Sequence, residues 1–188
     1  GTTTLARDLA ALYRTTWVPE YGREYSEARL ARGDQSDWRT EEFTHIAAEQ
    51  CRMEDAAARE SSGLLICDTD AFATSIWHRR YLDARSPAVE AIADSCRYDL
   101  YLLTGDEIPF VQDGLRDGEH IRHWMHDTFV EELERTGREY VLLRGSREER
   151  LARAVAVIEE RVLRTEGVEE LDAAACNVAW LRVTSVSP

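Results

Sequence analysis

The stretch Gly63-Leu64-Leu65-Ile66-Cys67-Asp68-Thr69-Asp70 decides the fold class of this chain. Its apolar run from Gly63 to Cys67 follows two serines and is ended by an acid, which is typical of a strand buried on both faces of a parallel sheet. A similar buried run covers Tyr98 to Leu103, and Glu139 to Leu143 predicts a further strand. Strands of this kind need helices on both faces of their sheet.

Segments with helical periodicity separate these strands. A short strand is predicted at Thr15–Val18, and the predicted helices cover Thr3–Arg14, Asp37–Glu60, 71–82, 87–96, 119–136 and 147–164. This alternation requires right-handed crossovers between parallel strands. We therefore predict one α/β domain over residues 1–188, a three-layer parallel sheet with helices on both faces. An ordered loop is expected at 108–118, and the tail 168–188 receives no assignment.

Composition excludes several classes of protein. The 188 residues carry 36 acidic side chains against 23 basic ones, all of them arginine, so the net charge is -13. A general affinity for the nucleic-acid backbone needs clustered cations, so we expect no nucleic-acid partner. No apolar run reaches the roughly 20 residues that span a bilayer, and no signal-peptide pattern opens the chain. We expect a cytoplasmic protein without a membrane partner.

The cysteines are Cys51, Cys67, Cys96 and Cys176. They are widely spaced, and no two of them form a C-x-x-C pair. Base rates for such a pattern favour reduced core thiols over a zinc site or a disulfide.

Ligands of parallel α/β sheets bind outside the carboxyl ends of the strands. The residues at these ends are Glu20–Glu24, Asp68–Asp70, Thr104–Glu107 and Arg144–Ser146. Asp68 and Asp70 suit Mg²⁺, which prefers oxygen ligands and usually keeps several waters. Asp70 can equally be the N-cap of the following helix, and the sequence leaves both roles open.

The start of the chain is similar to the end of a phosphate-binding loop. In the motif G-x-x-x-x-G-K-[ST], backbone N–H groups at a helix start hold phosphates, and the Ser or Thr binds the metal. Gly1-Thr2-Thr3-Thr4-Leu5 matches the end of this motif with Thr2 in the lysine position. A threonine-rich helix cap is the alternative. In the first interpretation, the first strand and most of the loop would precede residue 1.

Four motifs in order carry a family resemblance. They are Glu20-Tyr21-Gly22-Arg23-Glu24-Tyr25, Ile66-Cys67-Asp68-Thr69-Asp70 with Thr74, Tyr98-Asp99-Leu100, and Val111-Gln112-Asp113-Gly114-Leu115-Arg116. Over about residues 1 to 165, their order and separations resemble the ribosylnicotinamide kinase domain of NadR-type proteins. The resemblance implies a P-loop kinase fold with a mobile lid at 108–120. It also implies Mg²⁺ and ATP as cofactors, and phosphorylation of nicotinamide riboside to nicotinamide mononucleotide in NAD salvage.

The resemblance also assigns roles to residues. Gly1, Thr2, Thr3 and Thr4 would hold the nucleotide, and Thr3 with Asp68 would bind Mg²⁺. Glu20 would be the base, Asp70 would contact the acceptor ribose, and Arg116 and Arg122 would be the lid cations. The acceptor would also contact Trp17, Tyr21, Arg23 and Trp77. An ion pair on the surface is the alternative role for Arg23, and a solvated helix face is the alternative for Arg122.

The sequence departs from the family pattern in two places. Thr2 stands where the lysine belongs, and Pro19 stands where the family has a tryptophan, with Trp17 two residues earlier. Two other functions therefore stay open: a non-catalytic nucleotide-sensing domain, and a kinase for another small nucleoside. By the same resemblance, an adenylyltransferase domain is expected as a fused or cooperating partner.

Overall fold

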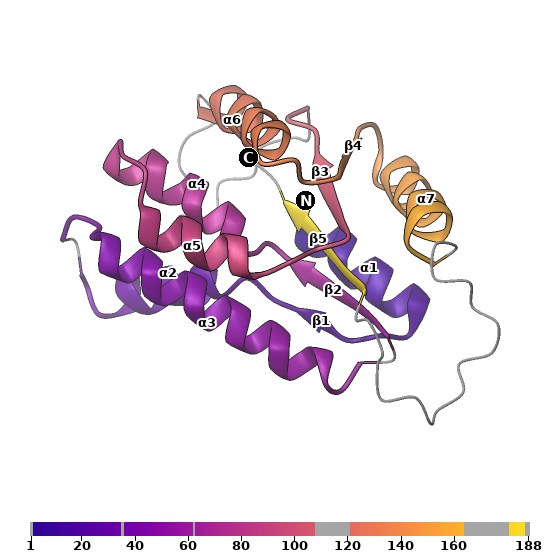
Figure 1. The fold of residues 1–188 in the computed structure, drawn as a ribbon, viewed down its shortest axis with the longest axis horizontal. Coiled ribbons are helices and arrows are strands. Elements are labelled where there is room, and N and C mark those ends of the chain that lie inside the picture. The colour runs from indigo at the N-terminus through magenta and orange to yellow at the C-terminus, as the bar shows by residue number, and fades with distance from the viewer. Residues whose placement is uncertain (1, 35, 62, 108–120, 164–180, 187–188) are drawn as a thin grey trace.

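A computed structural model describes residues 2–34, 36–61, 63–107, 121–163 and 181–186 (Figure 1). The predictions made for Gly1, for Arg116 and for the lid at 108–120 lie outside the described residues, as does most of the tail 168–188. Among the residues that are described, no helix has both the length and the apolar character that crossing a membrane requires.

The core of the fold is a parallel sheet, as predicted, and the described residues form five strands where the sequence predicted four. The strands are β1 (Trp17–Val18), β2 (Leu64–Asp68), β3 (Leu100–Thr104), β4 (Tyr140–Leu143) and β5 (Leu181–Val186), arranged in the order β1-β2-β5-β3-β4. Ile66 of β2 is in register with Val183 of β5, and Leu102 of β3 with Ser185. The sequence assigned no structure to this part of the tail, yet the tail supplies the central strand.

Helices cover both faces of this sheet (Figure 1). They are α1 (Thr2–Tyr13), α2 (Tyr21–Ala31), α3 (Thr40–Ala58), α4 (Ala71–Leu82), α5 (Pro87–Ser95), α6 (Arg122–Arg135) and α7 (Arg147–Val157), the last continuing as a π-helix over Ile158–Leu163. One apolar cluster joins the sheet to α1 and α7, and a second joins it to α3, α4, α5 and α6. The three-layer prediction is therefore confirmed.

Helix α2 was not predicted. Arg29 is the one residue of its 11 that is buried, so the segment carries no apolar stripe for periodicity to detect. The Arg29 guanidinium lies 4.1 Å from the Trp38 ring centroid and 3.3 Å from a Glu42 carboxylate oxygen. Ionic and ring contacts attach α2 to its neighbours in place of an apolar face.

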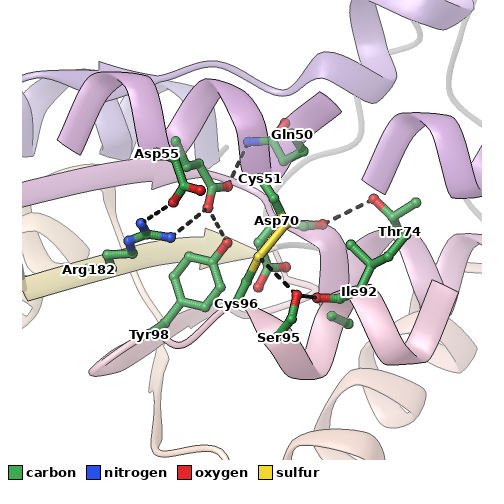
Figure 2. The surroundings of a disulfide bond; sticks show 12 residues. Gln50, Cys51, Asp55, Asp70, Thr74, Ile92, Ser95, Cys96, Tyr98 and Arg182 are labelled. Carbon is green, nitrogen blue, oxygen red and sulfur yellow. Dashed lines mark hydrogen bonds and ion pairs between the residues drawn. A yellow bond between two sulfur atoms is a disulfide. The ribbon is translucent and has the colours of Figure 1, made fainter. Parts of the chain in front are cut away.

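The cysteine prediction is wrong for two of the four residues. Cys51 of α3 and Cys96 at the end of α5 form a disulfide, with Cα atoms 6.8 Å apart (Figure 2). Cys67 is a buried thiol in β2, and Cys176 lies outside the described residues. The two bonded cysteines are 45 positions apart in sequence, and nothing in that spacing indicates that α3 and α5 lie side by side.

Candidate active site

The carboxyl ends of β1 and β2 lie next to each other. Val18 is in register with Cys67 in a parallel pair, so the turn at Pro19-Glu20 leaves the sheet beside Asp68. Residues in this position of an open parallel sheet are the usual ligand contacts. Two of the motifs identified in the sequence therefore meet at one edge of the sheet.

The start of α1 meets the same edge through its threonines. The hydroxyls of Thr2 and Thr3 lie near the Asp68 carboxylate and favour its ionised form, and Asp68 is 3% exposed. Burial raises the pKa of Asp68, and the two neighbouring hydroxyls act in the opposite direction. Thr4 points outward as an exposed residue of α1. The structure thus brings together Thr2, Thr3 and Asp68 of the predicted nucleotide site.

Thr69, which follows Asp68, has a left-handed backbone conformation. Its φ of +71° is uncommon for a β-branched residue, and such strain is concentrated at functional sites. The strained residue lies between the two acids of the motif. It directs the chain from the end of β2 into α4.

Asp70 is fully enclosed and caps α4. One carboxylate oxygen accepts from the Ala73 N–H at 2.8 Å, and the other accepts from the Tyr101 hydroxyl at 2.8 Å. Burial raises its pKa to about 6, against the effect of these hydrogen bonds. Its side chain is 0% exposed, so the geometry favours the capping role that the sequence left open. An acceptor contact would require the surrounding side chains to move.

Glu20 lies in the turn after β1, and Tyr21 is the first residue of α2. Glu20 is the N-cap residue of α2, and its carboxylate folds back over Gly22. The backbone N–H of Tyr21 donates to Gln50, and the phenol oxygen of Tyr21 lies 3.1 Å from His45 Nε2. Both partners come from α3. The predicted acceptor side of the site is therefore attached to α3 through Tyr21.

Arg23 forms an ion pair with Glu27 one helical turn away, at 3.2 Å. This is the alternative that the sequence left open for Arg23, and it is compatible with a further contact to a ligand. Arg122 is half-buried at the start of α6.

The two tryptophans of the predicted acceptor site lie on different faces of the sheet. Trp17 packs with the α1 and α7 cluster, and the Arg7 guanidinium lies 5.0 Å from its ring centroid. Trp77 belongs to the cluster on the opposite face and stacks on Tyr81, with ring centroids 6.1 Å apart. Tyr21 belongs to α2 and contacts α3, which packs in the same cluster as Trp77. The structure therefore does not place Trp17 near Trp77 and Tyr21.

Sequence reasoning missed a buried polar group on α3 that contacts this site. Gln50 and Glu54 of α3 are 1% and 0% exposed, and Tyr98 donates a hydrogen bond to Glu54. Figure 2 shows Gln50 and Tyr98 beside the Cys51–Cys96 disulfide. Positions 43, 46, 47, 50, 54 and 58 share the inner side of α3, so polar residues at two of them were a signal that could have been read.

The donor set of the site fits Mg²⁺. Hydroxyl and carboxylate oxygens from Thr3 and Asp68 are hard ligands, and Mg²⁺ in phosphate-transfer sites takes few protein ligands and completes its shell with water and phosphate. Within the described ranges, no group of three or more His, Cys, Asp and Glu side chains is arranged to hold a metal ion.

Comparison with known proteins extends this description. A family model described as an AAA domain matches residues 1–150. The chain belongs to this family. This AAA domain is 32% identical over 143 residues to the trifunctional NAD biosynthesis/regulator protein NadR of Escherichia coli (strain K12), covering 75% of the chain and 35% of the relative. The protein of the same name from Salmonella typhimurium (strain LT2) is 30% identical over 163 residues, covering 85% and 40%.

Solved structures show the same fold. A NadR protein in complex with NR superposes with a TM-score of 0.68 at 24% identity, covering 92% of this chain and 50% of that one. A NadR protein in complex with NAD and AMP-PNP gives a TM-score of 0.70 at 23% identity, with coverage of 92% and 48%. The resemblance to NadR-type proteins inferred from the motifs is confirmed. The AAA domain spans about two fifths or less of the length of these curated relatives.

Proposed function

We propose that this AAA domain transfers the γ-phosphoryl group of ATP to the 5′-hydroxyl of nicotinamide riboside, which yields nicotinamide mononucleotide and ADP. The observation that carries the proposal is the meeting of Thr2 and Thr3 with Asp68, beside the turn that holds Glu20. The names of the relatives, which place them in NAD biosynthesis, and the NR and AMP-PNP bound in the matched structures support it. By the same reasoning, an adenylyltransferase domain would be its fused or cooperating partner.

The nucleotide side of the reaction would lie at the start of α1. Backbone N–H groups at a helix start attract phosphate, and Thr3 with Asp68 would hold Mg²⁺. Bound there, Mg²⁺ neutralises charge that develops on the phosphate oxygens.

The acceptor side would lie at the start of α2. Glu20 would accept the proton of the attacking hydroxyl, since a half-buried carboxylate at the end of β1 is within reach of a ligand at this edge. Tyr21, Arg23 and Trp77 would contact the nucleoside. Asp70, enclosed under α4, would hold this edge of the sheet in place.

The positive charge at the transferring phosphoryl group would come from arginine. The chain contains no lysine, and Thr2 occupies the lysine position of the loop motif. Arg116 and Arg122 would supply this charge, since arginine serves this purpose in related phosphoryl transfers.

Two other functions are each favoured by one observation. The absence of the loop lysine favours a nucleotide sensor that binds ATP without transferring phosphate. The position of Trp17 on the opposite face from Trp77 favours a kinase for a nucleoside with a different base.

One assay separates the three functions. The full-length protein is incubated with Mg-ATP and nicotinamide riboside, and mass spectrometry quantifies nicotinamide mononucleotide and ADP. Equal amounts of both products are expected, with adenosine, cytidine and uridine as competing acceptors that give less product. ADP formed with another nucleoside alone would identify a different acceptor.

The Thr2→Lys variant provides the control for sensing. We expect it to change the turnover or the ATP affinity only modestly, because the arginines already supply charge. If the natural protein binds ATP without turnover and Thr2→Lys creates activity, the domain is a sensor and the kinase proposal is wrong.

A further inference from the structure

The first backbone N–H of α2 is bound by a side chain from another helix. N–H groups at a helix start have no partner within their own helix, and Glu20 makes no side-chain capping hydrogen bond to them. Gln50 Oε1 of α3 accepts from the Tyr21 N–H at 2.9 Å. The start of α2 is therefore held by a residue that is 29 positions away in the sequence.

The other end of the Gln50 side chain is also committed. Its Nε2 donates to Glu54 Oε1 at 2.9 Å, and the Tyr98 hydroxyl donates to Glu54 Oε2. Gln50 and Glu54 are both almost completely buried. Hydrogen bonds between buried groups are strong, and a buried polar group without a hydrogen-bond partner lowers the stability of the fold. The Gln50 and Glu54 side chains, which connect Tyr21 to Tyr98, are therefore restricted to one arrangement.

The chemistry of the two neighbours selects an amide at position 50. A backbone N–H can only donate, and an ionised carboxylate can only accept. The residue between the Tyr21 N–H and Glu54 must accept at one end and donate at the other. Glutamine does both, whereas an ionised carboxylate at position 50 would face Glu54 with no proton to donate.

Close packing makes the position of α2 sensitive to this contact. A Cβ atom added to Gly22 would lie 3.4 Å from Ile46 Cγ2 of α3 and 3.7 Å from Glu20 Oε1. The first turn of α2 therefore rests directly on α3. A change in the Gln50 contact would move Glu20 and Tyr21 relative to the carboxyl end of β2.

We infer that Gln50 is a positioning residue for the acceptor: it holds Glu20 and Tyr21 beside the carboxyl end of β2, through hydrogen bonds to the Tyr21 N–H and to Glu54. This inference rests on the proposed function and deepens it. The hydrogen bonds of Gln50 run to the Tyr21 N–H and to Glu54, both away from α1, so Gln50 should control the binding of the nucleoside and leave the binding of ATP unchanged.

The groups that face Glu54 determine the pH at which the inference is tested. Besides Gln50 they are Tyr98, Arg182, Asp70 and Cys67. Burial raises the pKa of Glu54 to about 7. Glu54 is therefore mostly ionised at pH 8. A second carboxylate at position 50 would be repelled by Glu54 at pH 8, whereas at pH 6 Glu54 is mostly protonated and could donate to that carboxylate.

The test compares Gln50→Glu with the exchange variant Gln50→Glu/Glu54→Gln in the full-length protein. In the exchange variant, the carboxylate at position 50 accepts from the Tyr21 N–H and from the new amide at position 54, so every hydrogen bond is restored. Ala48→Glu is the matched control, because it adds the same charge to an exposed position of α3. The KM values for nicotinamide riboside and for ATP are measured at pH 6 and pH 8.

For Gln50→Glu at pH 8, the KM for nicotinamide riboside is expected to rise about 10- to 100-fold, the loss that corresponds to a buried hydrogen bond to a charged group. The KM for nicotinamide riboside should return close to the natural value at pH 6, and also in the exchange variant at pH 8. The KM for ATP should stay unchanged in these variants, and both KM values should stay unchanged in the Ala48→Glu control. A parallel rise in both KM values, or no rescue by the exchange, would overturn the inference.

A second measurement does not depend on activity. The hydrogen-exchange protection factor of the Tyr21 amide should fall at least about tenfold in Gln50→Glu at pH 8 and recover in the exchange variant. If the natural protein phosphorylates no nucleoside, the proposed function fails, and this protection factor still decides whether Gln50 positions α2. Unchanged protection in a folded Gln50→Glu variant would contradict the positioning role.

Discussion

The nucleotide side and the acceptor side of the proposed site are built in different ways. Thr2, Thr3 and Asp68 lie together at the edge of the sheet. Glu20 and Tyr21 depend on α3 behind them, through the buried pair Gln50 and Glu54 and through the Cys51–Cys96 disulfide that joins α3 to α5. The first side consists of motif residues, whereas the second is supported by Gln50, Glu54 and the two cysteines, which lie outside every motif. Substitutions should therefore affect the two sides separately.

The largest expected effect tests the source of positive charge on the nucleotide side. Arg116→Ala should lower turnover by about 10³- to 10⁵-fold, as the loss of a comparable cation does in related phosphoryl transfers. The kcat of the full-length variant and its melting temperature are measured, and the latter should not change. Arg52→Ala, which removes an exposed arginine paired with Glu49, is the control. Near-normal turnover in Arg116→Ala would remove the lid-arginine role.

The disulfide tests the support of the acceptor side. It closes a loop of 45 residues, so its loss through Cys51→Ser/Cys96→Ser should lower the free energy of unfolding by roughly 4 kcal/mol. Urea denaturation followed by circular dichroism measures this value. The natural protein treated with a reducing agent should match the double variant. Equal stability of the oxidised and reduced proteins would show that the disulfide does not brace α3.

The buried acid Glu54 predicts a pH dependence of stability. Its folded pKa of about 7 lies above its ordinary value of 4.5, so the folded state retains a proton that the unfolded state has lost between these pH values. Its contribution to stability is therefore complete below about pH 4.5 and is lost as the pH rises through 7, by up to about 3 kcal/mol. Glu54→Gln should lack this decline. Parallel stability curves for the two proteins between pH 4.5 and 8 would refute the assignment.

The smallest expected effect concerns the metal on the nucleotide side. Asp68→Asn should reduce the gain in ATP affinity that Mg²⁺ provides by about 10- to 100-fold, since it removes the charge from the metal-binding carboxylate. Titration calorimetry with Mg-ATP measures the affinity. Asp8→Asn is the control, because it removes a carboxylate of α1 that pairs with Arg147 on the surface. An unchanged Mg²⁺ dependence in Asp68→Asn would exclude this carboxylate as a ligand.

The sequence predicted the layers of the fold and the edge of the sheet where the motifs meet. The buried runs around Ile66 and Leu102 carry this information locally, because only a strand covered on both faces is apolar throughout. Helix α2 and the central strand β5 were missed. The contacts of α2 are mostly ionic, aromatic and hydrogen-bonded, and the pairing of β5 with β2 and β3 depends on segments more than 75 residues away.

The candidate site was predictable to a similar extent. Thr3 and Asp68 belong to motifs, and the strand order brings them together. The role of Gln50 depends on how α2 packs against α3. The environment of Asp70 depends on Tyr101 of β3, whose hydroxyl donates to it. Such contacts between distant segments leave no pattern in one sequence beyond a polar residue on the inner side of a helix.

A crystal structure of the full-length protein with Mg²⁺, AMP-PNP and nicotinamide riboside tests the central claim most directly. The account predicts the γ-phosphate near the start of α1, the metal beside Thr3 and Asp68, and the 5′-hydroxyl of the riboside in hydrogen-bond contact with Glu20. A riboside bound away from the carboxyl ends of β1 and β2, or a nucleotide that does not contact the start of α1, would contradict it.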